Sequence, residues 1–160
     1  MWSVGRVMPS GVSTKLICVN MVDMPDADAP LGYLLTRLAT ALRAEVTTIA
    51  LEPAGLTFPQ YVCMRILAKS PGRSNADLAR DVNVSPQAMN MVVRGLQERG
   101  LVTRPASVSS GRSLPAQLTR AGVDLLKRID PGVREAEQHV LAPLSPEQRT
   151  DLKNLLAALG

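Results

Sequence analysis

The sequence feature that most constrains the fold is a pair of closely spaced helix-start signals in the middle of the chain. In "SNADLARD", Ser74 is followed three residues later by Asp77, a spacing at which the two side chains satisfy the free N–H groups of a helix start. In "SPQAMNMVVRGLQERG", Ser85 is placed to cap a second helix, Pro86 suits its first position and Gly100 ends it. Only "VNV" separates the two helices. The segment therefore predicts a helix-turn-helix unit.

The two faces of the second helix carry different chemistry. One face is an apolar stripe at helical spacing, predicted to pack into the core, and consists of Met89, Val92, Val93 and Leu96. The opposite face presents groups that bind base edges in DNA: Asn and Gln suit adenine, Arg suits guanine, and Ala or Met suits the thymine methyl group. Its members are Gln87, Ala88, Asn90, Met91 and Arg94. The Ser85 hydroxyl and the helix N-terminus suit a phosphate, so this helix is predicted to read a major groove.

Two short β-prone segments follow Gly100. "LVTRPA" and "LPAQLT" flank the Ser- and Gly-rich stretch "SVSSGRS", which predicts a two-stranded ribbon with an exposed tip. Arg112 lies at that tip, where an arginine suits the negative potential of a narrow minor groove. Ser110 and Ser113 beside it are predicted to bond phosphates.

The rest of the chain predicts helices on both sides of this unit. Leucines at helical spacing predict a first helix over 31–49, and a second helix is expected over 58–70. A long helix begins near Thr119 and is expected to kink at Pro131-Gly132, and a last helix follows "LSPEQ". Apolar residues are 46% of the chain and aromatic residues only 2%, so the core must be aliphatic. The fold class is therefore mostly α (α+β): a winged helix-turn-helix lobe with a two-stranded wing.

The domain organisation follows from these elements. Residues 1–29 are expected to be a disordered or extension arm, and 30–160 a single domain. Within that domain, 57–118 is the winged DNA-binding lobe, and the flanking helices of 31–51 and 119–160 are assigned to dimerisation.

Charge and residue usage exclude several classes of function. Residues 85–128 hold seven Lys and Arg against two acids, a local charge of +5 where the whole chain carries +4. Neither Cys18 nor Cys63 has a CxxC partner and the chain has one His, so no metal or cofactor is expected. No apolar run is long enough to span a membrane, and no phosphate loop or nucleophile elbow is present. A cytoplasmic protein that is not an enzyme is expected.

The chain resembles the MarR (multiple antibiotic resistance regulator) family of winged-helix transcription regulators. The resemblance rests on "LTFPQYVCMRIL", the helix-turn-helix segment with its ribbon, and "LTRAGVDLL", which occur in the family's order. It implies a homodimer with interlocked terminal helices that binds pseudo-palindromic double-stranded DNA, usually as a repressor. It also implies release by a small aromatic, often phenolic, anion. A pocket for that ligand is predicted from Tyr33, Arg37, Met64, Leu67 and Met89. The ribbon tip departs from the family's acidic, arginine-rich pattern.

Two alternatives use the same fold. A thiol-based redox sensor needs an exposed, electropositive cysteine, whereas Cys63 is predicted to be buried and the first helix contains no cysteine. A winged helix that contacts only proteins does not need the basic segment or the Gln, Asn and Arg face.

Overall fold

A computed structural model of the protein describes residues 29–104 and 115–159. Four helical elements precede the central unit. The helix α1 (Leu31–Val46) continues into the π-helical turn η1 (Thr47–Leu51) and the 3-10 turn η2 (Glu52–Ala54), and α2 (Phe58–Lys69) follows. Then come α3 (Asn75–Asp81), α4 (Pro86–Glu98), β1 (Val102–Thr103), β2 (Gln117–Leu118), α5 (Arg120–Val140) and α6 (Pro146–Leu159). The order of the predicted elements is confirmed.

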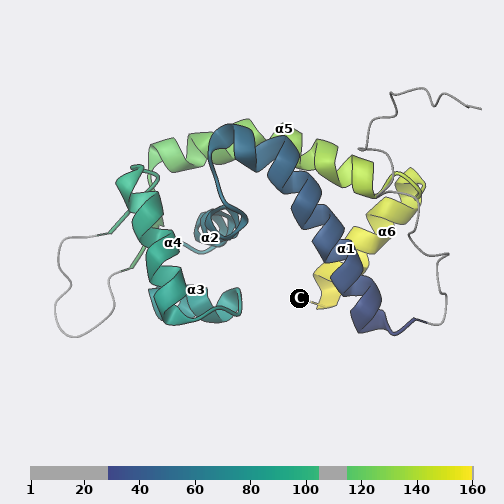
Figure 1. Cartoon of the computed structure of the whole chain (residues 1–160), viewed down its shortest axis with the longest axis horizontal. Helices are drawn as coiled ribbons and strands as arrows, with labels where there is room; N and C mark the ends of the chain where they lie inside the picture. Colours follow the sequence, from purple (N-terminus) through teal and green to yellow (C-terminus); the bar gives the residue numbers. More distant parts are fainter. Residues whose placement is uncertain (1–28, 105–114, 160) are drawn as a thin grey trace, which may run out of the picture.

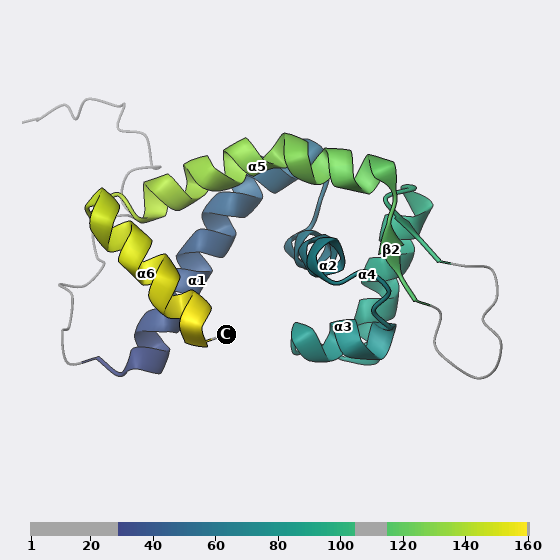
Figure 2. The ribbon, with the colours of Figure 1, turned by 180° about the vertical axis from the view of Figure 1, so that it is seen from behind.

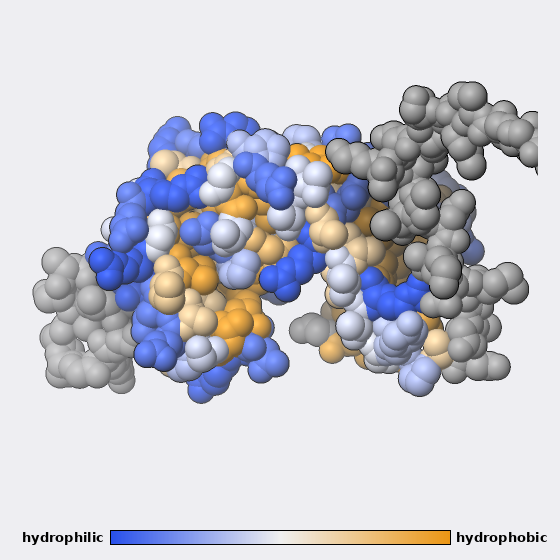
Figure 3. Space-filling view, viewed as in Figure 1, coloured by the Kyte–Doolittle hydropathy of each residue, from blue (hydrophilic) through white to orange (hydrophobic). Residues whose placement is uncertain are grey.

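The elements form two lobes joined along one long helix. α5 runs across the top of the molecule, with α2, α3, α4 and the strands beneath one end and with α1 and α6 beneath the other (Figures 1 and 2). A deep notch separates the lobes on the face shown in Figure 3, and apolar surface lies on both sides of it.

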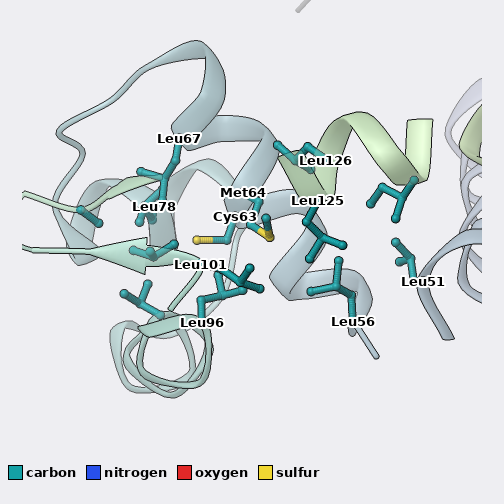
Figure 4. Close-up of a cluster of buried hydrophobic side chains, with 14 of the residues drawn as sticks. Leu51, Leu56, Cys63, Met64, Leu67, Leu78, Leu96, Leu101, Leu125 and Leu126 are labelled. Atoms are coloured by element: carbon teal, nitrogen blue, oxygen red, sulfur yellow. The ribbon is translucent and has the colours of Figure 1, made fainter. Parts of the chain in front are cut away.

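The core lies in the winged lobe and beneath α5. Leucines from η1, α2, α3, α4 and α5 converge on Cys63 and Met64, as Figure 4 shows. Cys63, Met64, Leu78 and Leu96 have no exposed surface. The expectation of an aliphatic core is therefore confirmed.

Local sequence explains where the elements of the winged lobe begin. The Thr57 hydroxyl accepts a hydrogen bond from the Gln60 N–H at 3.4 Å, and the Thr57 backbone N–H donates to Gln60 Oε1 at 3.0 Å, which completes a capping box at α2. At α5, the Gly122 N–H donates to the Thr119 hydroxyl at 3.1 Å. That hydroxyl in turn donates to the Gly100 carbonyl at 2.7 Å, which ties the start of α5 to the end of α4.

The first helix differs from the prediction. The first helix changes to a π-helical turn after Val46, where Thr47, Thr48 and Ile49 form a β-branched run that disfavours regular α-helix. α5 is one helix that runs through Pro131, so the proline does not end it, and the kink there stays a prediction. Gly132 has a packing role there: a Cβ atom at this position would lie 3.2 Å from the Ala50 Cβ, so the missing side chain lets α5 and η1 cross closely.

The sheet is shorter than the predicted ribbon. Val102 pairs with Leu118 and Thr103 with Gln117 in antiparallel register. An isolated bridge between Arg73 and Ala116 extends it toward the α2–α3 loop. Residues 105–114 of the predicted ribbon lie outside the described residues.

Candidate nucleic-acid interface

The helix-turn-helix unit is built by two serine caps and a sharp turn. The Asp77 N–H donates to the Ser74 hydroxyl at 3.1 Å, and the Asp77 carboxylate accepts from the Ser74 backbone N–H at 3.3 Å. Hydrogen bonds from Ser74 and then from Arg80 lower the pKa of Asp77, so the cap stays ionised at neutral pH. The Ala88 N–H donates to the Ser85 hydroxyl at 3.1 Å. Both predicted caps are confirmed.

The turn between α3 and α4 contains a left-handed residue. Asn83 has φ of 53°, a conformation that Asn tolerates better than most residues. The chain therefore reverses within three residues and places α4 across α3, as shown in Figure 1.

α4 has the predicted two faces. Met89, Val93 and Leu96 are buried, and Val92 is half-buried. The predicted base-reading face is exposed, and its residues are Gln87, Ala88, Asn90, Met91 and Arg94. Met91 is 77% exposed, so its side chain is accessible for the predicted contact with a thymine methyl group.

Arg94 forms an ion pair with Glu98, which was not among the predicted site residues. Its Nε donates to Glu98 Oε1 at 3.0 Å, one helical turn later, while the Arg94 side chain remains 81% exposed. An exposed pair of this kind stabilises a helix only slightly, so little free energy opposes turning the guanidinium to a base or phosphate.

Asn90 is less free than its exposure suggests. Its Oδ1 accepts a hydrogen bond from the Asn75 amide, and the Asn75 Oδ1 accepts one from the Arg104 guanidinium. Asn75 and Arg104 were not predicted as site residues. Asn75 lies 15 positions before Asn90, on α3, and Arg104 lies 14 positions after it, beyond β1. No rule of helical or strand spacing pairs residues so placed.

The cations of the basic segment do not share one surface. Arg99 Nη1 and Nη2 donate to the carbonyls of Gly55 and Ala54 at 2.6 and 2.9 Å, so this side chain joins the end of α4 to the turn before α2. Arg104 is partly buried, and burial lowers the pKa of its guanidinium. Two cations of the basic segment, Arg99 and Arg104, therefore bond other parts of the protein itself, and Arg94 is the cation on the exposed face of α4.

The predicted wing contacts Ser110, Arg112 and Ser113 lie outside the described residues. The base of the wing is described. The Gly72 N–H donates to the Ala116 carbonyl and the Ala116 N–H to the Arg73 carbonyl, both at 3.0 Å. The wing therefore starts from a base held against the α2–α3 loop.

The five residues of the predicted ligand pocket are not brought together. Met64, Leu67 and Met89 are at most 1% exposed and fill the core, which leaves no surface for a ligand. Tyr33 and Arg37 lie at the exposed start of α1, away from α2 and α4 in Figures 1 and 2, with the Arg37 guanidinium 5.8 Å from the Tyr33 ring centroid. Tyr33 and Arg37 do lie on one face of α1, as their spacing predicts. Spacing along a helix cannot show which other elements that face meets.

A different hollow has the chemistry for a small aromatic anion. A groove of about 370 Å³ lies between α1, α2, α5 and α6. Phe58 and Tyr61 supply aromatic rings, Arg43 and Lys153 supply cations, and the rest is mainly aliphatic. The Arg43 guanidinium lies 4.9 Å from the Phe58 ring centroid, and Lys153 pairs with Glu137 across the groove at 2.5 Å. Aliphatic walls with a few convergent charges are typical of small-molecule sites.

The thiol of Cys63 is unsuited to redox sensing. It is fully buried, and burial raises its pKa to about 11. A thiolate is the reactive form, so this cysteine is inert at neutral pH. Cys18 lies outside the described residues.

Across residues 29–104 and 115–159, no group of three or more His, Cys, Asp or Glu is arranged to hold a metal ion. None of the described helices combines the length and apolar character that crossing a bilayer needs.

Comparison with known proteins agrees with this geometry. The model of the MarR family matches residues 56–114. The HTH-type transcriptional repressor Rv2887 of Mycobacterium tuberculosis is 56% identical over 133 residues, which are 83% of this chain and 95% of the relative. The crystal structure of the M. tuberculosis protein Rv2887 in complex with DNA has a TM-score of 0.71 and 49% identity, and the match covers 83% of this chain and 99% of that one.

A second solved structure contains a small aromatic acid. The crystal structure of Rv2887 in complex with salicylic acid has a TM-score of 0.71 and 54% identity, covering 84% of this chain and 98% of the other. The identity over almost the whole of these relatives, the winged helix-turn-helix fold and the two-faced α4 lead to one conclusion: this chain belongs to the MarR family.

Proposed function

We propose that the protein is a transcriptional repressor that binds double-stranded DNA as a homodimer. The observation that carries the proposal is α4, whose buried stripe holds it rigidly while the opposite face presents Gln87, Asn90 and Arg94 to solvent. A 56% identical relative is named a transcriptional repressor, and a solved structure of that protein contains DNA. The protein acts by occupying its operator rather than by catalysing a reaction, and the cytoplasm is the proposed location because the target is DNA.

The dimer explains how the two lobes work together. α1 and α6 form the dimerisation region, while residues 57–118 form the reading lobe with the wing as its second contact. A two-fold dimer presents two copies of α4, so the operator is a pseudo-palindrome with half-sites about 34–36 Å apart. Ser85 at the N-terminus of α4 orients the helix on a phosphate, and Arg112, Ser110 and Ser113 of the wing supply the contacts beside it.

A small aromatic carboxylate is the proposed effector. The groove between α1, α2, α5 and α6 joins the dimerisation helices to the reading lobe through α2, so a ligand there changes the distance between the two α4 helices. Arg43 or Lys153 suits the carboxylate, and Phe58 and Tyr61 suit the ring. The relative solved with salicylic acid supports this choice of ligand class.

DNA binding is tested by selecting bound sequences from a random duplex library at about 150 mM salt. The wild-type protein should enrich a pseudo-palindrome, and Arg94→Gln should weaken binding to it by about 5- to 100-fold and relax one base preference. Arg134→Gln removes the same charge from the exposed surface of α5 and should bind as wild type. Selection of no sequence by the wild type would overturn the proposal.

The effector site is tested on the selected operator. Salicylate should release the wild-type protein, and Arg43→Met should need a several-fold higher salicylate concentration while binding DNA normally. A Tyr33→Phe, Arg37→Met variant changes the pair at the start of α1 and should respond as wild type. An unchanged response of Arg43→Met, together with a weakened response of the α1 variant, would place the effector at Tyr33 and Arg37 instead.

A further inference from the structure

Three side chains from three separate elements form one hydrogen-bonded chain behind the exposed face of α4. Arg104 follows β1 at the base of the wing, Asn75 is the first residue of α3, and Asn90 lies in the first half of α4. The Arg104 guanidinium donates to Asn75 Oδ1, and Asn75 Nδ2 donates to Asn90 Oδ1. Asn75 is 8% exposed and is the buried middle of this chain.

The direction of the hydrogen bonds is set by chemistry. A guanidinium has donors and no acceptor, so the Asn75 group that faces Arg104 must be its oxygen. The other end of the Asn75 amide is then an NH2 group, which can only donate. Asn90 must therefore turn its own oxygen inward to accept, and its NH2 group is the part left for a partner.

This orientation restricts what Asn90 can recognise. The adenine contact expected from the sequence needs both amide groups, because the oxygen accepts from N6 while the nitrogen donates to N7. With its oxygen turned inward to Asn75, Asn90 presents its NH2 donors outward. Donors suit the O6 and N7 of guanine, the N7 of adenine and the O4 of thymine, whereas cytosine presents only the N4 amino group in the major groove.

We infer that Asn90 is a donor-only base reader, and that Arg104 and Asn75 are the positioning residues that give it this polarity. The inference rests on the proposed DNA binding and adds a determinant of its specificity. It also links the base of the wing to α4, because Arg104 belongs to the segment that leads into the wing. A movement of the wing base that breaks the bond from Arg104 frees the Asn75 amide to turn, and Asn90 then loses its preference.

One substitution reverses the polarity without removing the chain. In Asn75→Asp the carboxylate still accepts from Arg104, but it has no donor for Asn90. Asn90 must then donate its own NH2 inward and expose its oxygen. Folding should be retained, since the new carboxylate pairs with Arg104 and lies in the first turn of α3, where negative charge is favourable.

The test is selection from a random duplex library with the full chain, comparing wild type, Asn75→Asp and Asn90→Ala. Asn90→Ala identifies the base position that Asn90 reads, because the preference there should be lost. At that position the wild type should favour guanine or thymine over cytosine by about 5-fold, the size expected for one hydrogen bond. Asn75→Asp should favour cytosine or adenine there and leave the preference that depends on Arg94 unchanged.

A second variant separates positioning from general damage. Arg104→Met should weaken the base preference only at the position that Asn90 reads. Arg99→Met removes an equal charge from a different intramolecular contact and should leave that preference unchanged. An identical base profile for wild type and Asn75→Asp, or no effect of Asn90→Ala at any position, would overturn the inference while the proposed function stands. Failure of the wild type to select any sequence would instead overturn the proposed function.

Discussion

Gly122, near the start of α5, has no room for a side chain. An added Cβ atom would lie 2.2 Å from the Leu101 carbonyl oxygen, and that oxygen belongs to backbone that already accepts a hydrogen bond from the Thr119 N–H at 3.0 Å. The contact is therefore between two backbones that cannot move aside independently.

We expect Gly122→Ala to lower the free energy of unfolding by about 2–3 kcal/mol, the upper part of the range for overpacking. The measurement is urea denaturation monitored by circular dichroism. Gly32→Ala is the control, because a Cβ atom there meets nothing within 4 Å and alanine favours a helix. Equal stability of the two variants would contradict the close approach of α5 to Leu101.

Cys63 gives a chemical test of burial. Its pKa of about 11 means that the native thiol stays protonated at pH 8, and its sulfur is not exposed. In a Cys18→Ser background, iodoacetamide should modify the native protein slowly at pH 8 and the unfolded protein quickly. Fast modification of the native protein would restore the redox-sensing alternative.

The raised pKa of Cys63 also makes the stability of the protein depend on pH. The folded-state pKa is raised above the ordinary value of 9.0, so the unfolded chain loses its thiol proton first as the pH rises. The contribution of Cys63 to stability is complete below about pH 9 and should decline between pH 9 and 11. Cys63→Ala should not show this component of the alkaline destabilisation when both proteins are unfolded in urea at several pH values.

At the scale of elements, Arg99 holds α4 to the turn that precedes α2. Its guanidinium donates to the carbonyls of Gly55 and Ala54, so one side chain supplies hydrogen bonds to two backbone carbonyls of that turn. Arg99 belongs to the basic segment of the sequence, yet its role here is structural.

We expect Arg99→Met to lower the free energy of unfolding by about 1–3 kcal/mol, because two carbonyl groups lose charged donors. At a temperature where it is folded, its operator preference should match that of the wild type. Arg94→Gln should show the opposite pattern, with near-normal stability and altered DNA binding. A loss of base preference in Arg99→Met would mean that the interface extends past the end of α4.

The whole molecule leaves apolar surface exposed on α1 and α6. Leu31 is 68% exposed, Leu155 65% and Leu159 85%, and α6 has no buried residue within its own chain. A 14-residue helix is marginal in isolation, and α6 gains little further stability from burial within its own chain. A second copy of the chain is the partner that covers it in the proposed dimer.

The double variant Leu155→Glu, Leu159→Glu should therefore shift the protein to monomers or aggregates and weaken operator binding by more than about 10-fold, since two linked half-sites are lost. Sedimentation velocity gives the mass. Val123→Glu places the same charge on an exposed apolar residue of α5 in the other lobe and should remain dimeric. A dimer of unchanged stability in the double variant would show that α6 is not part of the dimer interface.

The sequence by itself determined the elements whose signals are local. Ser74, Ser85 and Thr119 each accept a backbone hydrogen bond from a residue three positions later. Each cap and the helix it begins are therefore encoded in the same few residues. The apolar stripe of α4 is equally local, because helical periodicity decides which side chains share a face.

Only the tertiary structure decided which faces meet. The partners of Asn90 and Arg99 come from positions 15 to 45 residues away, and their pairing depends on how helices cross rather than on spacing. For the same reason, the sequence placed Met64, Leu67 and Met89 in a pocket with Tyr33 and Arg37, whereas in the structure these three residues are buried in the core. Periodicity identifies a face, but the packing of the whole chain determines whether that face meets solvent, a ligand or another helix.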